Sequence, residues 1–218
     1  SYALSGTDAG NYHVLQPTGL TADITQADLQ VTGVSASNKV YNANTTATLG
    51  GTAAVAALAS DVVTVNALSA AGAFADKNVG MGKAVTVTGY TLGGADAGNY
   101  TLVSTTGSTT ANIGLRPLRV YYTAASKTYD GGVSATVTSS YNAVSGDTLT
   151  INQSAAFGDK NAGYDKPVYV SGITVGGADA SNYSLLNATS STSASISSKG
   201  LTISGITASN KVYDGNAT

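Results

Sequence analysis

Few side chains in this sequence belong to the types that catalyse reactions or hold metal ions. Its 12 acidic residues are all aspartates, because glutamate is absent, and they accompany one histidine, His13, and no cysteine. A catalytic nucleophile needs a base beside it, and a zinc site needs several Cys or His ligands. The composition therefore predicts a protein that is not an enzyme, with no catalytic residues, no metal ligands and no cofactor.

Lysine and asparagine side chains recur in a pattern that allows one covalent reaction. In some surface fibres a lysine amine joins an asparagine side chain in an isopeptide bond, assisted by a buried acid that here would have to be Asp. We favour a simpler interpretation, in which the lysines form salt bridges and pack their aliphatic stems on the surface. The recurring residues are Lys39, Lys127 and Lys211, and Asn11, Asn99 and Asn182.

Three sequence blocks return along the chain at intervals of about 85 residues, the size of a small domain. The first block begins at residue 37, the second at residue 74 and the third at residue 94. The matching segments are 37–43, 126–131 and 209–215; 74–80 and 157–163; and 6–12, 94–100 and 177–183. They predict the C-terminal part of one repeat at 1–27, complete repeats at 28–114 and 115–198, and the N-terminal part of another at 199–218.

Within each repeat, short alternating segments separated by Gly, Asn and Asp predict β-strands. We expect an all-β fold of tandem small β-sandwich modules; the alternative is a β-grasp-like module with a short helix at residues 55–58. Opening strands are predicted at 29–34 and 118–122, and central strands at 83–90 and 166–173. Late and early strands of the partial repeats are predicted at 20–24 and 201–206.

The junction between repeats has a constant length. Ile24 and Leu29 are five residues apart, and the same spacing separates Ile113 from Leu118 and Ile196 from Leu201. Flexible linkers tolerate changes of length, so a constant junction indicates that one strand passes directly into the next. We expect the repeats to lie end to end as a semi-rigid rod. The partial repeats at the ends predict head-to-tail self-association, in which the end of one chain pairs with the start of the next. The alternative is that the sequence is a segment of a continuous filament.

The repeated blocks resemble a known family. Lys-x-Tyr-Asp-Gly at 127–131 and 211–215, with Gly-Ala-Asp-Ala-Gly-Asn-Tyr at 94–100, is similar to the YDG domain and its relative, the MBG domain. The resemblance implies a large bacterial surface adhesin like filamentous haemagglutinin, exported by two-partner secretion and active in cell adhesion or biofilm. It implies an extracellular stalk that projects a binding region, with neighbouring repeats as partners. The first complete repeat departs from the pattern, because Asn42 and Ala43 follow Tyr41.

We interpret the residues of the repeated blocks as structural turns, because Asp and Asn bind nearby backbone N–H groups and Gly takes positive φ. Contact with a ligand, or calcium held between modules by Asp96 and another carboxylate, is the alternative. The residues are Tyr41, Tyr129, Asp130, Gly131, Tyr213, Asp214, Gly215, Asp96, Asn99, Asp179 and Asn182.

Exposed tyrosines could stack on sugar rings, although Tyr also packs within sheets. The candidates are Tyr121, Tyr122 and Tyr169, which would make each repeat a carbohydrate-binding module for an extracellular polysaccharide or a host glycan. Thr32 and Gly33 occupy the positions of the first two in the other repeat, which favours a scaffold. The net charge of −2 and the lack of long apolar stretches predict neither nucleic-acid binding nor membrane insertion.

Overall fold

The computed structural model of the chain describes residues 1–103 and 107–217, whose regular structure is almost entirely β-strand. Its helical elements are three short 3₁₀ turns, η1 (Ala9–Asn11), η2 (Ala97–Asn99) and η3 (Ala180–Asn182). The prediction of an all-β fold is therefore confirmed. Residues 55–58, where the β-grasp alternative places a helix, contain none.

In the part of the chain that the structure describes, no helix has the length and apolar character that crossing a membrane requires.

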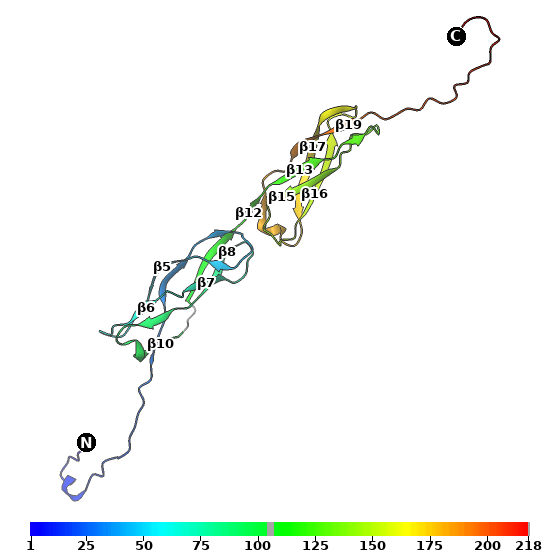
Figure 1. Cartoon of the computed structure of the whole chain (residues 1–218). Helices are drawn as coiled ribbons and strands as arrows, with labels where there is room; N and C mark the ends of the chain where they lie inside the picture. The colour runs from blue at the N-terminus through cyan, green and yellow to red at the C-terminus, as the bar shows by residue number, and fades with distance from the viewer. Residues whose placement is uncertain (104–106, 218) are drawn as a thin grey trace. The chain divides into compact units, whose positions relative to one another are not determined.

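The first repeat forms a β-module with curled sheets (Figure 1). Its main sheet has the order β3-β11-β8-β7-β4, and three short pairs, β1-β10, β2-β5 and β6-β9, complete it. The pairs β3-β11 and β1-β10 are parallel, whereas β2-β5, β4-β7, β6-β9 and β7-β8 are antiparallel. The strands are β1 (Ala27–Leu29), β2 (Thr32–Ala36), β3 (Lys39–Val40), β4 (Thr46–Ala47), β5 (Leu49–Ala54), β6 (Thr64–Asn66), β7 (Ala71–Phe74), β8 (Gly80–Thr88), β9 (Thr91–Gly93), β10 (Tyr100–Leu102) and β11 (Gly107–Gly114).

The second repeat has a matching module. Its main sheet has the order β14-β19-β17-β16, with β14 parallel to β19, and the pairs β12-β18 and β13-β15 flank it. One long strand, β17, takes the place of β8 and β9. The strands are β12 (Arg116–Leu118), β13 (Val120–Ala124), β14 (Lys127–Thr128), β15 (Val137–Tyr141), β16 (Thr150–Phe157), β17 (Gly163–Gly176), β18 (Tyr183–Leu185) and β19 (Ser190–Ser197).

The compact units of the fold do not coincide with the sequence repeats. Three segments of the first repeat, residues 38–45, 75–83 and 111–114, belong to the same compact unit as the second repeat. Strands β8 and β11 run through both units. The N-terminal unit comprises Ser1–Ser37, Thr46–Phe74 and Ala84–Thr110, and the C-terminal unit comprises Asn38–Thr45, Ala75–Lys83 and Ala111–Thr218.

Alternate residues of the long central strands form the cores, as the two-residue period of a strand requires. Val85 and Val87 of β8 are fully buried, and so are their counterparts Val168 and Val170 of β17. In the second repeat, Val168 packs with Phe157, Ala194 and Ile196. Burial of each such side chain contributes about 1.5–3 kcal/mol, so these few residues supply much of each module's stability.

The predicted opening strands are each interrupted. The first divides into β1 and β2 and the second into β12 and β13, with a break of one or two residues. The reason is a change of partner: β1 pairs with β10 and β2 with β5, while β12 pairs with β18 and β13 with β15. At the junction β11 ends at Gly114 and β12 begins at Arg116. One strand thus passes almost directly into the next, as the constant spacing predicts.

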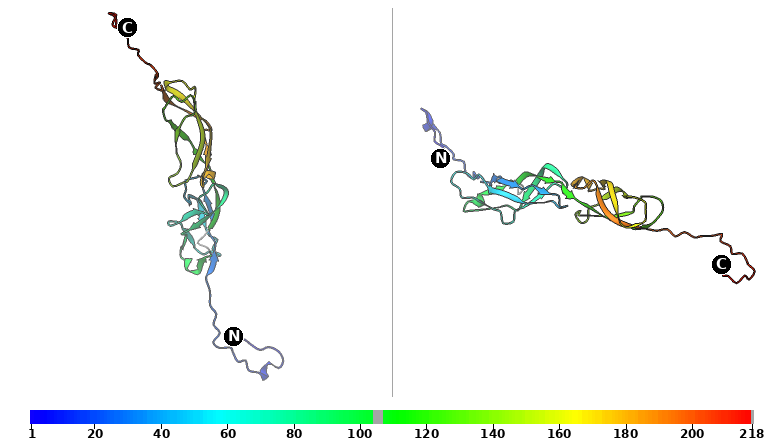
Figure 2. Two further views of the ribbon diagram at one scale, coloured as in Figure 1. Left: turned by 90° about the vertical axis from the view of Figure 1, so that its right-hand side faces the viewer. Right: turned by 90° about the horizontal axis from the view of Figure 1, so that it is seen from above.

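The end segments lack the strands that their sequences predict at 20–24 and 201–206. Residues 1–26 contain only η1, and residues 198–217 contain no regular element. Ile24, Leu201 and Ile203 are largely exposed, and both views of Figure 2 show these segments as single traces without a strand beside them. A strand needs hydrogen-bonded neighbours, and the described residues place none beside these two segments.

Candidate functional site

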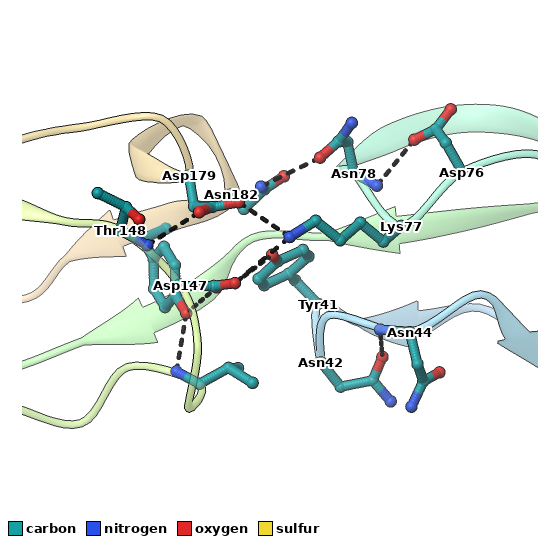
Figure 3. A network of polar contacts seen from close by, with 12 residues as sticks. Tyr41, Asn42, Asn44, Asp76, Lys77, Asn78, Asp147, Thr148, Asp179 and Asn182 are labelled. Atoms are coloured by element: carbon teal, nitrogen blue, oxygen red, sulfur yellow. Dashed lines mark hydrogen bonds and ion pairs between the residues drawn. The ribbon is translucent and has the colours of Figure 1, made fainter.

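A network of polar contacts in the C-terminal unit joins residues of both sequence repeats (Figure 3). Tyr41 follows strand β3, and Lys77 lies in the loop between β7 and β8. The Tyr41 hydroxyl donates a hydrogen bond to Asp147 Oδ1 at 3.1 Å. Lys77 Nζ donates to Asp147 Oδ1 at 3.4 Å and to Asp179 Oδ1 at 3.0 Å. We call Tyr41 and Lys77 the donor cluster.

The opposite side of the network is the acceptor cluster, formed by Asp147, Asp179, Asn182 and Tyr183. Each carboxylate uses its second oxygen within its own repeat. Asp147 Oδ2 accepts from the Tyr183 hydroxyl at 2.6 Å, and Asp179 Oδ2 accepts from the Thr148 N–H at 2.9 Å. These local bonds orient the Oδ1 atoms toward the donor cluster, which lowers the entropy lost when the contact forms.

Asn182 is the only buried polar residue in the described part of the chain, with 2% of its surface exposed. Its Oδ1 accepts from the Val79 N–H at 2.9 Å, and its Nδ2 donates to Asn78 Oδ1 at 3.3 Å. A buried amide is tolerated when both its donor and its acceptor have partners. Residues 78 and 79 provide those partners.

Aromatic contacts accompany the polar ones. The rings of Tyr41 and Tyr183 meet edge to face, with centroids 5.6 Å apart and planes at 73°. Lys77 Nζ lies 5.9 Å from the centroid of the Tyr41 ring, within the range of a cation–π interaction. Tyr41 has no exposed surface. The contact therefore combines apolar burial with directed hydrogen bonds.

Neighbouring groups shift the pKa values of Lys77, Asp179, Tyr41 and Tyr183 in the direction that keeps each in the protonation state needed for its hydrogen bond. The hydrogen bond to Asp179, followed by the one with Tyr41, raises the pKa of Lys77 above its ordinary value. Burial, followed by the hydrogen bond to Asp147, raises the pKa of Tyr183 to about 12. Burial is also the first cause of the raised pKa of Tyr41. The Thr148 N–H and then Lys77 lower the pKa of Asp179. Near neutral pH, Lys77 and Asp179 are thus ionised while both tyrosines keep their protons.

The arrangement is suited to holding chain segments together. Each of its charged groups already has a partner of opposite charge or a hydrogen-bond donor. Among the described residues, no group of three or more His and Asp side chains is placed to hold a metal ion.

The repeated Tyr-Asp-Gly residues lie in turns. Asp130 Oδ1 accepts from the Gly132 N–H and from Lys127 Nζ, both at 2.9 Å, and Gly131 has a φ of +83°. Ala43 takes the position of Gly131 in the first repeat with a φ of +62°, a conformation that favours glycine. The Tyr129 N–H, like that of Tyr41, donates to the end of the last strand of its repeat, at Ser197 O.

The C-terminal copy of this motif has the same local hydrogen bond although it lies in the end segment. Asp214 Oδ1 accepts from the Asn216 N–H at 3.0 Å and Gly215 has a φ of +80°. Tyr213 is 93% exposed. The turn thus forms from local residues alone, whereas burial of its tyrosine needs the rest of a repeat.

Asp96 and Asn99 lie at η2 as Asp179 and Asn182 lie at η3. Asp96 Oδ2 accepts from the Val62 N–H at 2.8 Å, so it fastens one loop of the first repeat to another. The structure gives these aspartates backbone partners and, for Asp179, a lysine. Among the described residues, Asp96 belongs to no group of three or more His and Asp side chains that could hold a metal ion.

The three candidate glycan contacts differ in their surroundings. Tyr121 and Tyr169 are 54% and 58% exposed. Tyr122 instead packs against the cluster of Val120, Val170 and Ile173, and its buried hydroxyl has no partner. The partly buried ring of Tyr122 is thus less accessible to a sugar than the rings of Tyr121 and Tyr169.

The lysines and asparagines proposed for isopeptide bonds bind other groups. Lys127 Nζ contacts Asp130, Gly132 O and Ser134 O, whereas Asn182 binds residues 78 and 79. Lys39 Nζ donates to Asn44. The structure does not bring Lys127 and Asn182 together.

Sequence reasoning missed Lys77, Asn78 and Asp147 as site residues. A signal was present, because Asp76-Lys77-Asn78 returns as residues 159–161 and Asp61 occupies the place of Asp147. What the repeat pattern could not reveal is that these residues from different blocks meet. His13 lies in the exposed N-terminal segment, apart from the network.

Comparison with known proteins agrees with the repeat pattern. The family model described as the YDG domain matches residues 25–109 and again residues 115–193. No curated protein and no solved structure matches the chain.

Proposed function

The chain belongs to the YDG domain family, with two tandem copies of the domain, and from this premise we propose that it is a non-enzymatic stalk segment of a large bacterial surface adhesin. In this proposal the repeats act outside the cell, in adhesion or biofilm, and project a distal binding region. Two-partner secretion of a protein like filamentous haemagglutinin is the proposed route of export. Neighbouring repeats are the main partners.

One observation carries the stalk role: residues of two consecutive repeats share one network. Tyr41 and Lys77 come from the first repeat, whereas Asp147, Asp179 and Asn182 come from the second, and all five lie in the C-terminal unit. A covalent junction alone lets consecutive repeats move independently. A buried network that spans the junction opposes such motion, which is what a stalk needs in order to transmit force.

Distance measurement in the intact chain tests this role. Since the chain has no cysteine, spin labels attach only at introduced cysteines, and Leu68→Cys and Tyr164→Cys place them at highly exposed positions in the two repeats. We expect a narrow distance distribution that broadens when Lys77→Ala and Asp147→Ala are added. A matched control replaces Lys160 and Asp61, the equivalent residues of the other repeat, with Ala. Equal widths in all three backgrounds would contradict the stalk role.

The location needs a separate test. An antibody raised against the chain is expected to label intact, unpermeabilised cells of the organism that produces it. Labelling only after permeabilisation would exclude the proposed surface location.

A carbohydrate-binding role is the second candidate, and one feature favours it. Tyr169 lines a shallow hollow of about 410 Å³ together with Ser171, Thr189, Ser190 and Ser191. A half-exposed ring beside hydroxyl groups suits the stacking of a sugar. A glycan array with the full chain tests it: saturable binding lost in Tyr169→Ala but kept in Tyr121→Ala would support a glycan site. Absence of saturable binding would exclude the carbohydrate-binding role and would not affect the stalk role.

A further inference from the structure

The first and last segments of the second repeat pair with each other and run in the same direction. We call residues 116–129 the opening segment and residues 183–197 the closing segment. Strand β12 of the opening segment is parallel to β18 of the closing segment, and Arg116 pairs with Tyr183. Further along, β14 is parallel to β19, and Lys127 pairs with Ile196. The two segments are therefore joined near both of their ends.

Hydrogen bonds between backbone groups extend both strand pairs. The Leu186 N–H donates to Leu118 O at 2.8 Å, just after β18, and the Tyr129 N–H donates to Ser197 O at 2.8 Å, just after β14. Each bond lies at the C-terminal end of its parallel pair. The opening and closing segments thus have two separate ladders of hydrogen bonds.

Side chains join the two segments between these ladders. Asn187 Oδ1 accepts from the Val120 N–H at 3.1 Å, and Asn187 Nδ2 donates to the Val120 carbonyl oxygen at 3.0 Å. A peptide unit of a neighbouring strand offers the same donor and acceptor, so this amide takes the place of a strand partner. Nearer to β14, the Ser195 N–H donates to the Ser126 hydroxyl oxygen at 3.0 Å.

The contacts between the two segments lie against the core of the repeat. Leu118 and Val120 of the opening segment and Ile196 of the closing segment are almost completely buried. A hydrogen bond in such surroundings is stronger than one in water, because the local dielectric constant is low. Separating the two segments would also expose these apolar side chains, which adds to the cost.

The first repeat has the same arrangement of first and last segments. Strand β1 is parallel to β10, and β3 is parallel to β11. The Val103 N–H donates to Leu29 O at 3.0 Å, and the Tyr41 N–H donates to Gly114 O at 2.9 Å, again just after each parallel pair. Both repeats therefore place their opening and closing segments in parallel.

We propose that the opening and closing segments of each repeat form a mechanical clamp, which keeps the repeat folded when the chain is pulled along its length. The proposal rests on the stalk role only for the direction of the load. Tension enters a repeat at the start of its opening segment and leaves at the end of its closing segment. Because the segments are parallel, these points lie at opposite ends of the paired strands, and the load slides one segment past the other.

The parallel direction decides how the hydrogen bonds carry this load. When parallel segments slide, all the bonds between them are stretched together, so they share the force. In an antiparallel pair the same load would act on two adjacent ends and would break the bonds one after another. The clamp therefore resists a much larger force than the same number of bonds would resist if they were opened in turn.

Pulling the full chain with optical tweezers between two introduced cysteines tests the clamp, because the native chain has no cysteine. Tyr2→Cys with Tyr213→Cys, both at exposed positions, loads the two repeats in the proposed direction. Tyr164→Cys with Tyr213→Cys instead separates the antiparallel strands β17 and β19 at the end where Gly163 pairs with Ile196. At one loading rate we expect the unfolding force to be about twofold higher or more in the first geometry, because forced unfolding follows the rate of unfolding under load.

An asparagine variant tests the contribution of the side-chain contact. Asn187→Ala removes both bonds to Val120 and should lower the force of one of the two unfolding steps in the first geometry. Asn142→Ala is the matched control: Asn142 Oδ1 accepts from the neighbouring Arg119 N–H at 2.8 Å, but residue 142 follows β15 and lies outside the closing segment. The control should leave both steps unchanged.

Equal forces in the two pulling geometries would overturn the proposal, and this comparison decides the matter even if Asn187→Ala does not fold. Equal forces for Asn187→Ala and Asn142→Ala would exclude the side-chain contact from the clamp. If the clamp fails while Lys77→Ala with Asp147→Ala still broadens the label distances, the stalk role stands. If the clamp holds while the label distances do not change, each repeat resists force by itself and the network at Asp147 does not join the repeats.

Discussion

Asn99 and Asn182 occupy the same place in two copies of one sequence block, but only Asn182 is buried. Their tyrosine neighbours differ in the same way. The pKa of Tyr100 is raised first by its hydrogen bond to Asp61, whereas that of Tyr183 is raised first by burial. The hydrogen bonds of the turn are thus set within each repeat. Asn182 and Tyr183 are buried because residues 41 and 77–79 pack against them. The described residues place no equivalent segments against Asn99 and Tyr100.

The largest difference in the free energy of unfolding between the two repeats is expected when these asparagines are replaced by arginine. We expect Asn182→Arg to lower the free energy of unfolding by about 3–5 kcal/mol, because it places an unpaired charge in a buried site. Asn99→Arg should change it by less than about 0.5 kcal/mol, because that position is exposed. Urea denaturation of dilute full-length chains measures both. Similar losses in the two variants would show that the two sites have equivalent surroundings.

Replacing the equivalent aspartates, Asp147 and Asp61, by alanine should give a smaller difference in the free energy of unfolding. Asp147→Ala leaves Tyr41 and Tyr183 without their acceptor and Lys77 with one carboxylate, so we expect a loss of about 2–3 kcal/mol. Asp61→Ala removes one acceptor from Tyr100 and should cost about 1 kcal/mol. The same denaturation experiment applies, at low protein concentration. A larger loss for Asp61→Ala would contradict the assignment of the network to Asp147.

Alkaline pH should separate the two tyrosine sites. Folding raises the pKa of Tyr183 from 10.0 to about 12, so the folded state favours the protonated hydroxyl. This contribution to stability is fully present below pH 10 and is lost as the pH rises toward 12. Tyr183→Phe should therefore flatten the fall in melting temperature over that range, and more strongly than Tyr100→Phe. Identical pH profiles would contradict a special environment at Tyr183.

The smallest expected effect concerns the lysines. Lys77 is 39% exposed, so its ion pairs are partly screened, and Lys77→Met should cost only about 0.5–1 kcal/mol. Lys160→Met should be nearly neutral in dilute solution. Melting curves at low and high salt test this, since salt should narrow the difference between native chain and Lys77→Met. A salt-independent difference would mean that packing of the Lys77 stem, and not its charge, stabilises the contact.

Local patterns made much of the fold predictable. Alternation along residues 83–90 and 166–173 predicts the central strands β8 and β17, because a half-buried strand exposes every second residue. Asp130 and Gly131 predict a turn because their preferences act over three or four residues. The break between β1 and β2 was not predictable in this way, since it arises from a change of strand partner. The strands expected at 20–24 and 201–206 do not form. Alternation gives a segment a preference for the extended conformation, but a strand also needs a second strand to pair with.

The sequence by itself determined the repeats, the strand-rich modules and the constant junction, because each depends on local preferences and on spacing along the chain. Only the tertiary structure showed that Tyr41, Lys77 and Val79 of one repeat meet the second repeat at Asp147, Asp179 and Asn182. Asn182 and Asn99 have nearly the same sequence context, and so do Lys77 and Lys160. Burial and pairing are properties of segments that meet in space after being separated by about 70–105 residues along the chain. No local pattern encodes that meeting, so identical motifs acquire different surroundings in the two repeats.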